Sequence, residues 1–199
     1  MGDKIPGSNV CARRSAQRSV IMRKSTSAAV VLISLASVLH AEDLTHCTEG
    51  WAETEAGNHL AAIDHFNLCI TTGDLTKATL ARTYRNMGIA YRRAKEPKRA
   101  IEAHTLAIEL QPDDLYADYV GRANSYDEAG DIDRALADYE RALELNPNFG
   151  ETYYNRGIAR QHHGQTEEAK KDFLRAYEVG LRTKMLLDML AWYGLTPAS

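Results

Sequence analysis

Apolar residues recur at helical spacing in the segment RTYRNMGIAYRR, which occupies residues 82–93. They fall at i, i+3, i+4 and i+7, on one side of a helix: Tyr84, Met87, Gly88 and Tyr91. A second side carries three arginines with an isoleucine among them and a fourth arginine at its edge: Arg82, Arg85, Arg92, Ile89 and Arg93. Clustered like charges on a helix repel by a few tenths of a kcal/mol per pair. The nearly all-arginine side therefore needs an explanation.

A motif of small residues and one ring-bearing residue recurs at a regular interval along the chain. Ala100, Ala135 and Ala169 begin three copies of it. In each copy a ring-bearing residue follows four positions later and a second alanine seven positions later. A weaker copy begins at Ala62. A period of about 34 residues predicts helix–turn–helix units that bury their apolar faces only by stacking on one another.

The residues of these units resemble the tetratricopeptide repeat, whose pattern is W-x₂-L-G-x₂-Y…A-x₆-A-x₄-P. The second unit matches at seven positions: Tyr84, Met87, Gly88, Tyr91, Ala100, Ala107 and Pro112. The third matches at seven others: Tyr119, Tyr126, Gly130, Ala135, Tyr139, Ala142 and Pro147. The fourth matches at six: Tyr153, Gly157, Gly164, Ala169, Phe173 and Ala176. The first keeps only four: Gly50, Gly57, Ala62 and Phe66. His104 stands where an aromatic is usual, and Arg122 replaces a leucine.

This resemblance covers roughly residues 43–182 and implies an all-α fold. The expected architecture is a right-handed α-solenoid of about four helix–turn–helix units within residues 42–182. The units fall at residues 43–76, 81–114, 116–149 and 150–182. Beyond them, residues 183–199 include the segment TKMLLDMLAWYGL, whose apolar stripe predicts a helix that caps the exposed end of the solenoid. A docking helix for a partner is the alternative.

The segment 1–41 has the composition of an export leader. Arg23 and Lys24 precede the uncharged run STSAAVVLISLASVL, whose apolar part has a length typical of a signal peptide. The run is shorter than the roughly 20 residues that cross a membrane. We expect cleavage near Ala41, with Met22 as an alternative start. The expected location is periplasmic or secreted, without a stable membrane span after removal of the signal. An uncleaved anchor and twin-arginine export stay open.

Charge and cysteine content refine this picture. The net charge is −3, and the leader has six basic side chains against one acidic. The residues after the leader are therefore acidic overall, and the chain does not have the charge expected of a nucleic-acid-binding protein. Removal of Cys11 with the leader leaves Cys47 and Cys69, a candidate disulfide in an oxidising compartment. Two buried thiols are the alternative.

No motif for catalysis is present. The sequence lacks a Gly-rich phosphate loop, GxSxG and HExxH. The histidines do not predict a metal site. His162 and His163 are adjacent, and we expect them to point in different directions. His59 and His65 are six residues apart, and neither belongs to a Cys/His cluster with the spacing of a zinc site. We expect no enzyme, no cofactor, no metal and no small-molecule substrate.

The resemblance implies a concave groove lined by the second, fifth, ninth and twelfth residues of each first helix. The predicted partner-binding residues are Trp51, Arg82, Arg85, Ile89, Arg92, Asn124, Tyr154 and Ile158. Because a guanidinium grips a carboxylate through two hydrogen bonds, an acidic protein or peptide segment is the expected partner. Alternatively, the arginines pair with acids of adjacent helices, such as Asp127 and Glu151. The chaperone-tail clamp of some family members is not implied, since Asn86 alone matches it.

These observations favour a non-enzymatic adaptor or scaffold, periplasmic or secreted, that binds a protein or peptide segment in its groove. Two other functions stay open. One is a cytosolic chaperone or adaptor, if the leader is not a signal. The other is a noncatalytic regulatory subunit of a cell-envelope enzyme. The partner itself cannot be named from the fold.

Overall fold

A computed structural model describes residues 44–110 and 115–195, which belong to one compact unit, Ala41–Ser199. The export leader, Met22, Cys11 and the predicted cleavage edge at Ala41 lie outside the described residues, as does Pro112. Every regular element within the described ranges is a helix, and no strand occurs there.

The helices follow one another along the chain with short connections. Their bounds are α2 Thr45–Ala56, α3 His59–Thr72, α4 Lys77–Arg93, α5 Pro97–Leu110, α6 Tyr116–Glu128, α7 Ile132–Leu145, α8 Gly150–His162, α9 Thr166–Glu178 and α10 Lys184–Trp192. None of these helices is both long enough and apolar enough to span a membrane.

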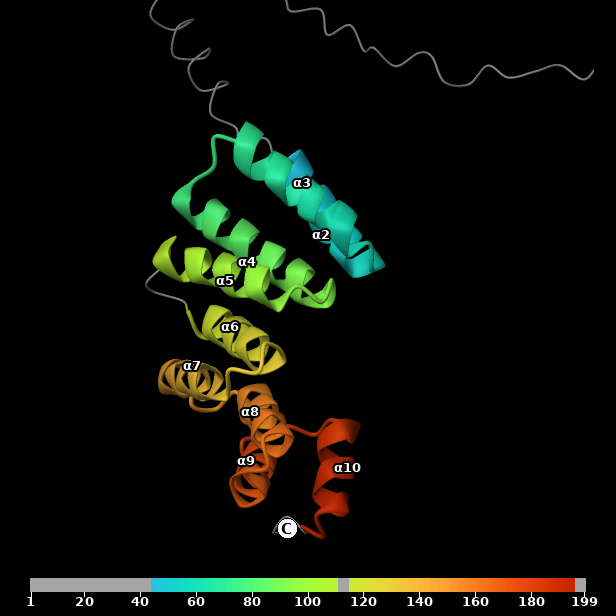
Figure 1. The fold of residues 1–199 in the computed structure, drawn as a ribbon, viewed down its shortest axis with the longest axis vertical. Coiled ribbons are helices and arrows are strands. Elements are labelled where there is room, and N and C mark those ends of the chain that lie inside the picture. Colours follow the sequence, from blue (N-terminus) through green and yellow to red (C-terminus); the bar gives the residue numbers. More distant parts are fainter. Residues whose placement is uncertain (1–43, 111–114, 196–199) are drawn as a thin grey trace, which may run out of the picture. The chain divides into compact units, whose positions relative to one another are not determined.

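Packing between helices follows their order in the chain. The most extensive contacts lie within the pairs α2–α3, α4–α5, α6–α7 and α8–α9, and each pair also packs on the next through α3–α4, α5–α6 and α7–α8. The first helices of neighbouring pairs also contact one another, and α10 packs on α9 (Figure 1). The predicted all-α solenoid with a C-terminal capping helix is confirmed.

Small residues allow the two helices of a pair to approach closely. A Cβ atom built on Gly50, Gly88 or Gly157 would lie 2.7 Å from a ring of the partner helix. Those rings belong to the residues that occupy the aromatic position of each unit, here Phe66, His104 and Phe173. All three rings are almost fully buried. The contact between glycine and ring therefore sets the distance within each pair.

The turn inside a unit needs a residue with a left-handed backbone. Gly130 has a φ of 81° between α6 and α7, where glycine accepts this conformation at little cost. In the second unit the corresponding place is taken by Lys95, whose φ is 64°. Backbone hydrogen bonds close both turns, from Asp131 N to Tyr126 O and from Glu96 N to Tyr91 O, each 2.9 Å long.

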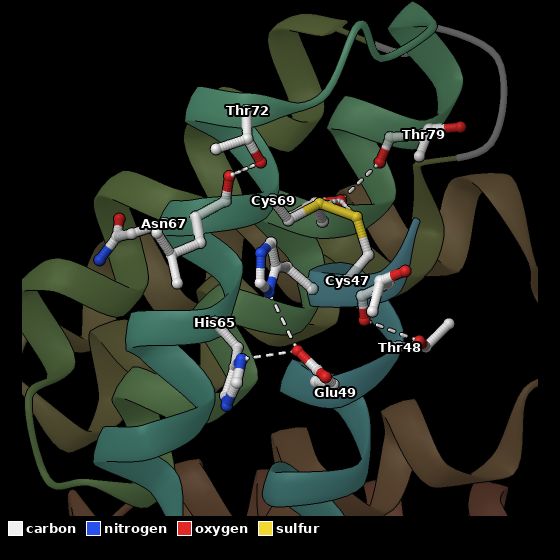
Figure 2. Close-up of a disulfide and its surroundings, with 12 residues drawn as sticks. Cys47, Thr48, Glu49, His65, Asn67, Cys69, Thr72 and Thr79 are labelled. Atoms are coloured by element: carbon white, nitrogen blue, oxygen red, sulfur yellow. Dashed lines mark hydrogen bonds and ion pairs between the residues drawn. A yellow bond between two sulfur atoms is a disulfide. The ribbon is translucent and has the colours of Figure 1, made fainter. Parts of the chain in front are cut away.

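A disulfide joins the two helices of the first pair. Cys47 in α2 and Cys69 in α3 are bonded through their sulfur atoms, with 5.1 Å between the Cα atoms (Figure 2). Thr83 Oγ1 of α4 lies 3.8 Å and 3.7 Å from the two sulfurs, so the bridge also contacts the second pair. The cross-link connects residues 22 positions apart.

Loss of this bridge should destabilise the first pair. In the chain-entropy account, a disulfide that closes a loop of this length contributes roughly 3 kcal/mol to the free energy of unfolding. We predict that Cys11→Ser protein, denatured without reductant, has no titratable thiol, and that reduction lowers its unfolding free energy by about that amount. Two titratable thiols before reduction would contradict the bridge. Cys11→Ser/Cys47→Ser/Cys69→Ser protein, which should not respond to reductant, is the control.

Candidate functional site

An open pocket of about 440 Å³ lies between the first helices of the first two pairs, α2 and α4. Its lining residues are Leu44, Cys47, Thr48, Trp51, Phe66, Thr79, Arg82, Thr83 and Asn86. The disulfide and the buried ring of Phe66 thus contribute to a wall whose position is fixed by the packing of α2 on α3.

Three side chains give this pocket its chemistry. Trp51 is 45% exposed, so a large part of its apolar surface is available for contact. Arg82 and Asn86 lie one turn apart on α4, and both line the pocket. Among the described residues Arg82 is exposed and has no ion pair or hydrogen bond, which leaves the donors of its guanidinium free. Asn86 adds both a donor and an acceptor.

The next arginine on α4 is engaged within the chain. Arg85 Nε lies 2.8 Å from Asp118 Oδ1 of α6, and Arg85 Nη2 lies 2.6 Å from Asp118 Oδ2. Asp118 is fully buried. Burial alone would raise the pKa of Asp118, but His104 Nδ1, 3.7 Å away, and the Arg85 guanidinium hold that pKa below its usual value. Burial lowers the pKa of His104, which is therefore neutral near pH 7.

The other arginines of α4 also connect helices. Arg92 Nη1 donates to Glu128 Oε1 of α6 over 2.9 Å, and Arg93 Nη1 donates to the carbonyl oxygen of Thr54 in α2 over 3.1 Å. The sequence left two explanations for the arginine side of α4, ligand binding and pairing with acids of adjacent helices. In the structure Arg85 and Arg92 pair with acids of α6. The acids are Asp118 and Glu128, in place of the Asp127 and Glu151 named from the sequence.

Asp127 has a different role. His162 Nδ1 lies 3.4 Å from its Oδ2, and His163 Nε2 lies 3.2 Å from its Oδ1. The expectation that these adjacent histidines point in different directions is thus wrong, because both rings reach one carboxylate of α6. They connect the third pair of helices to the fourth.

The remaining predicted groove residues are not gathered at the pocket. Asn124 Oδ1 accepts a hydrogen bond from the Tyr139 hydroxyl over 2.5 Å, and Ile89 is half-buried. Tyr154 and Ile158 pack against an apolar cluster of α9 and α10. Only Trp51 and Arg82 of the predicted set line the pocket, and the others lie along α4, α6 and α8.

Two Arg–Asp pairs with buried carboxylates were not predicted from the sequence. Arg122 Nε lies 2.7 Å from Asp138 Oδ2, and Arg156 Nη2 lies 2.6 Å from Asp172 Oδ1, in each case between the two helices of one unit. The hydrogen bond to Asp138 raises the pKa of Arg122 above its usual value. The sequence contained a signal for these pairs, because arginine and aspartate are 16 residues apart in both of them. Arg122 also replaces a leucine of the repeat pattern.

A group of polar side chains on α2 and α3 was also missed. His46 Nδ1 lies 3.0 Å and His65 Nδ1 lies 3.1 Å from the same oxygen, Glu49 Oε2. The i, i+3 spacing of His46 and Glu49 was visible in the sequence. The approach of His65 was not, because it depends on how α3 is aligned with α2 (Figure 2).

Comparison with known proteins agrees with the geometry. Two family models described as tetratricopeptide repeat match residues 118–149 and 138–171. The small glutamine-rich tetratricopeptide repeat-containing protein 2 of Mycosarcoma maydis is 32% identical over 119 residues, which are 59% of this chain and 32% of that protein. The chain thus spans less than two thirds of that curated relative.

Solved structures of tetratricopeptide repeat domains and of MamA are also similar to this chain. The crystal structure of MamA is similar with a TM-score of 0.60 and 25% identity, over 76% of this chain and 86% of that one. The first TPR of Spaghetti (RPAP3), bound to the HSP90 peptide SRMEEVD, is similar with a TM-score of 0.54 and 25% identity, over 59% of this chain and 92% of that one.

The buried pair of Arg85 and Asp118 predicts a large effect of a neutral substitution. Removal of one member of a buried ion pair typically costs 3–5 kcal/mol, so Asp118→Asn should lower the free energy of unfolding at pH 7 by about 3 kcal/mol. Because the pKa of Asp118 is lowered by folding, its contribution is complete above about pH 4 and is lost as the pH falls through the folded-state pKa. The difference between the two proteins should therefore shrink in acid.

Denaturant unfolding of both proteins at several pH values measures this effect. Glu144→Gln is the matched control, since it removes the carboxylate that accepts from Arg141 over 2.7 Å in a pair whose members are both exposed. Its cost should stay below about 0.5 kcal/mol. An equally small cost for Asp118→Asn, or a constant difference across pH, would contradict the assigned role of the buried pair.

Proposed function

We propose that this protein, a chain of tetratricopeptide repeats, is a non-enzymatic adaptor that binds an acidic peptide segment of a partner protein between α2 and α4. The observation that carries the proposal is the pocket that contains Trp51, Arg82 and Asn86. The pocket is thus lined by the half-exposed indole of Trp51, the unpaired guanidinium of Arg82 and the carboxamide of Asn86. Their chemistry is complementary to an apolar side chain, a carboxylate and a peptide group.

Charge favours an acidic ligand over a basic one. Among the described residues that line the pocket, Arg82 supplies the free cation, and none carries a carboxylate. An arginine in such a position can hold a carboxylate through two parallel hydrogen bonds. Since Arg85 and Arg92 are occupied by Asp118 and Glu128, Arg82 is the arginine of α4 that we assign to the ligand.

The comparisons support the same chemistry. The peptide bound to the first TPR of Spaghetti (RPAP3), SRMEEVD, has three acidic side chains and one basic. That domain is similar to 59% of this chain. The Asn86 side chain is available here to hydrogen-bond a peptide backbone, whereas the wider set of clamp residues is not present.

Export is a second part of the proposal. The basic start of the chain, its short apolar run and the alanine at position 41 favour a signal peptide. The disulfide between Cys47 and Cys69 is also typical of an oxidising compartment. We therefore place the adaptor in the periplasm or outside the cell.

Export predicts a processed N-terminus. N-terminal sequencing of the protein isolated from its native host should find a chain that begins near Glu42 and co-fractionates with secreted or periplasmic proteins. A chain in the cytosolic fraction that begins at Met1 or Met22 would contradict export. It would leave the peptide pocket untouched, because the pocket lies wholly in α2, α3, α4 and the residue before α2.

Reversal of the charge of Arg82 should weaken peptide binding. Hydrogen bonds to charged groups contribute about 1.5–3 kcal/mol, and each 1.4 kcal/mol is a factor of ten, so Arg82→Glu should weaken binding of labelled SRMEEVD by tenfold or more. Wild type should prefer this peptide to its amide analogue SRMQQVN, which lacks the three acidic side chains, and Trp51→Ala should weaken the binding of both peptides. Fluorescence anisotropy measures the affinities, and circular dichroism establishes that each variant is folded.

Arg141→Glu is the matched control. It makes the same charge change at an exposed arginine of α7 outside the pocket, and it should leave the peptide affinity unchanged. The same variants should be used to capture partners from the native host. Equal affinity of wild type for the acidic peptide and its amide analogue, together with equal recovery of partners by Arg82→Glu, would remove this pocket from the binding site.

A further inference from the structure

We infer that His46, Glu49 and His65 form a binding site for one divalent transition-metal ion of the zinc class. The site is independent of the proposed peptide pocket, because none of the three residues lines that pocket. It lies between α2, which contains His46 and Glu49, and α3, which contains His65. Among the described residues these three are grouped closely enough to hold an ion.

The distances between the potential ligand atoms fit a small ion. Nδ1 of His46 and Nδ1 of His65 lie 3.0 Å and 3.1 Å from Oε2 of Glu49. The three residues can each offer one ligand atom such that these atoms lie within 4.8 Å of one another. In a tetrahedral zinc site, with metal–ligand bonds of about 2.0–2.1 Å, neighbouring ligand atoms are about 3.3 Å apart. An ion could therefore enter with small side-chain rotations and no backbone movement.

The contacts within the group are not all satisfied without an ion. Nδ1 of His65 is shielded from solvent, and although it lies 3.1 Å from Glu49 Oε2, it is not aligned to form a hydrogen bond. A buried polar atom without a hydrogen-bond partner is unfavourable. A metal bond to this nitrogen would remove that cost, and the same ion would draw the carboxylate and the second imidazole together.

The donor set decides the class of ion. Two imidazole nitrogens and one carboxylate oxygen are ligands that suit Zn²⁺, and also Cu²⁺ and Ni²⁺, whereas Mg²⁺ and Ca²⁺ prefer oxygen ligands alone. The three side chains are 37%, 45% and 31% exposed. A fourth coordination position is thus open to water or to a side chain of a partner, as it is in zinc sites with three protein ligands.

The disulfide fixes the two helices at the level of this site. His46 precedes Cys47 in α2, and His65 lies one turn before Cys69 in α3 (Figure 2). The cross-link therefore limits how far the ligands on α2 can move from the ligand on α3. Since the bridge has already ordered the hairpin, less conformational entropy is lost when the ion binds.

Zinc titration of the oxidised full chain tests this assignment. The background should be Cys11→Ser protein, stripped of metal and kept without reductant, so that no free thiol competes for the ion. We expect one ion bound through these residues, and a midpoint of thermal unfolding raised by at least about 4 °C at a hundredfold excess of Zn²⁺ over its dissociation constant. Mg²⁺ at the same concentration should have no effect.

His46→Gln/His65→Gln should weaken zinc binding at least tenfold and remove the thermal shift. Glu49→Gln, which keeps the size of the side chain, is a second variant, and circular dichroism with thiol titration establishes that both are folded and oxidised. The matched control is His162→Gln/His163→Gln, which removes two histidines that share the Asp127 carboxylate but belong to no grouping of three ligand atoms among the described residues. It should bind zinc as the parent does.

Cobalt provides a direct readout of coordination. Co²⁺ in a four-coordinate site absorbs visible light far more strongly than hexaaqua Co²⁺, so the parent protein should develop this absorption and the His46→Gln/His65→Gln protein should not. Zinc binding of equal affinity in the parent and in His46→Gln/His65→Gln, or no zinc-dependent shift in the parent, would overturn the site.

Discussion

The packing of a glycine against a ring is the contact on which the rest of this structure depends. In three of the four helix pairs, a ring of the second helix occupies the space that a Cβ atom of the first helix would fill. Helices held this closely bury the alanines of the repeat pattern almost completely, and they hold the other side chains of α2, α4, α6 and α8 at fixed positions. The pocket, the ion pairs and the disulfide all occur on helices placed in this way.

One of these rings also shapes the electrostatics. His104 replaces the usual aromatic residue of the second unit, and it packs between Gly88 of its own unit and Gly121 of the next. Its neutral imidazole lies beside Asp118, which in turn accepts two hydrogen bonds from Arg85. A buried carboxylate is tolerated there because the guanidinium compensates its charge. The guanidinium of Arg85 is thereby engaged within the chain.

The first helix pair combines three features within the described part of the chain. It carries the disulfide, about half of the pocket lining, and the group of His46, Glu49 and His65 next to the disulfide. It also matches the repeat pattern least well. Where fewer of the usual small and aromatic residues hold the pair together, a covalent cross-link supplies part of the stability. Trp51 of this pair is left partly exposed, in the pocket that it shares with Arg82 of α4.

The sequence by itself determined the helix pairs and their order. Period, small residues and turn glycines are local properties, and the stacking of successive units follows from them because a single pair cannot bury its apolar face. It also indicated which side of α4 is charged, and that Cys47 and Cys69 lie on facing helices. The repeat pattern thus predicted nearly all of the fold.

Only the tertiary structure decided which side chains meet. Whether Arg85 reaches Asp118 or another acid depends on how far α6 is displaced along α4, a quantity that the repeat period does not specify. The same holds for His65, which approaches Glu49 because of the alignment of α3 with α2. Contacts between polar side chains are short-ranged and directional, so a shift of one helical turn replaces one partner by another while the apolar packing and the fold remain the same.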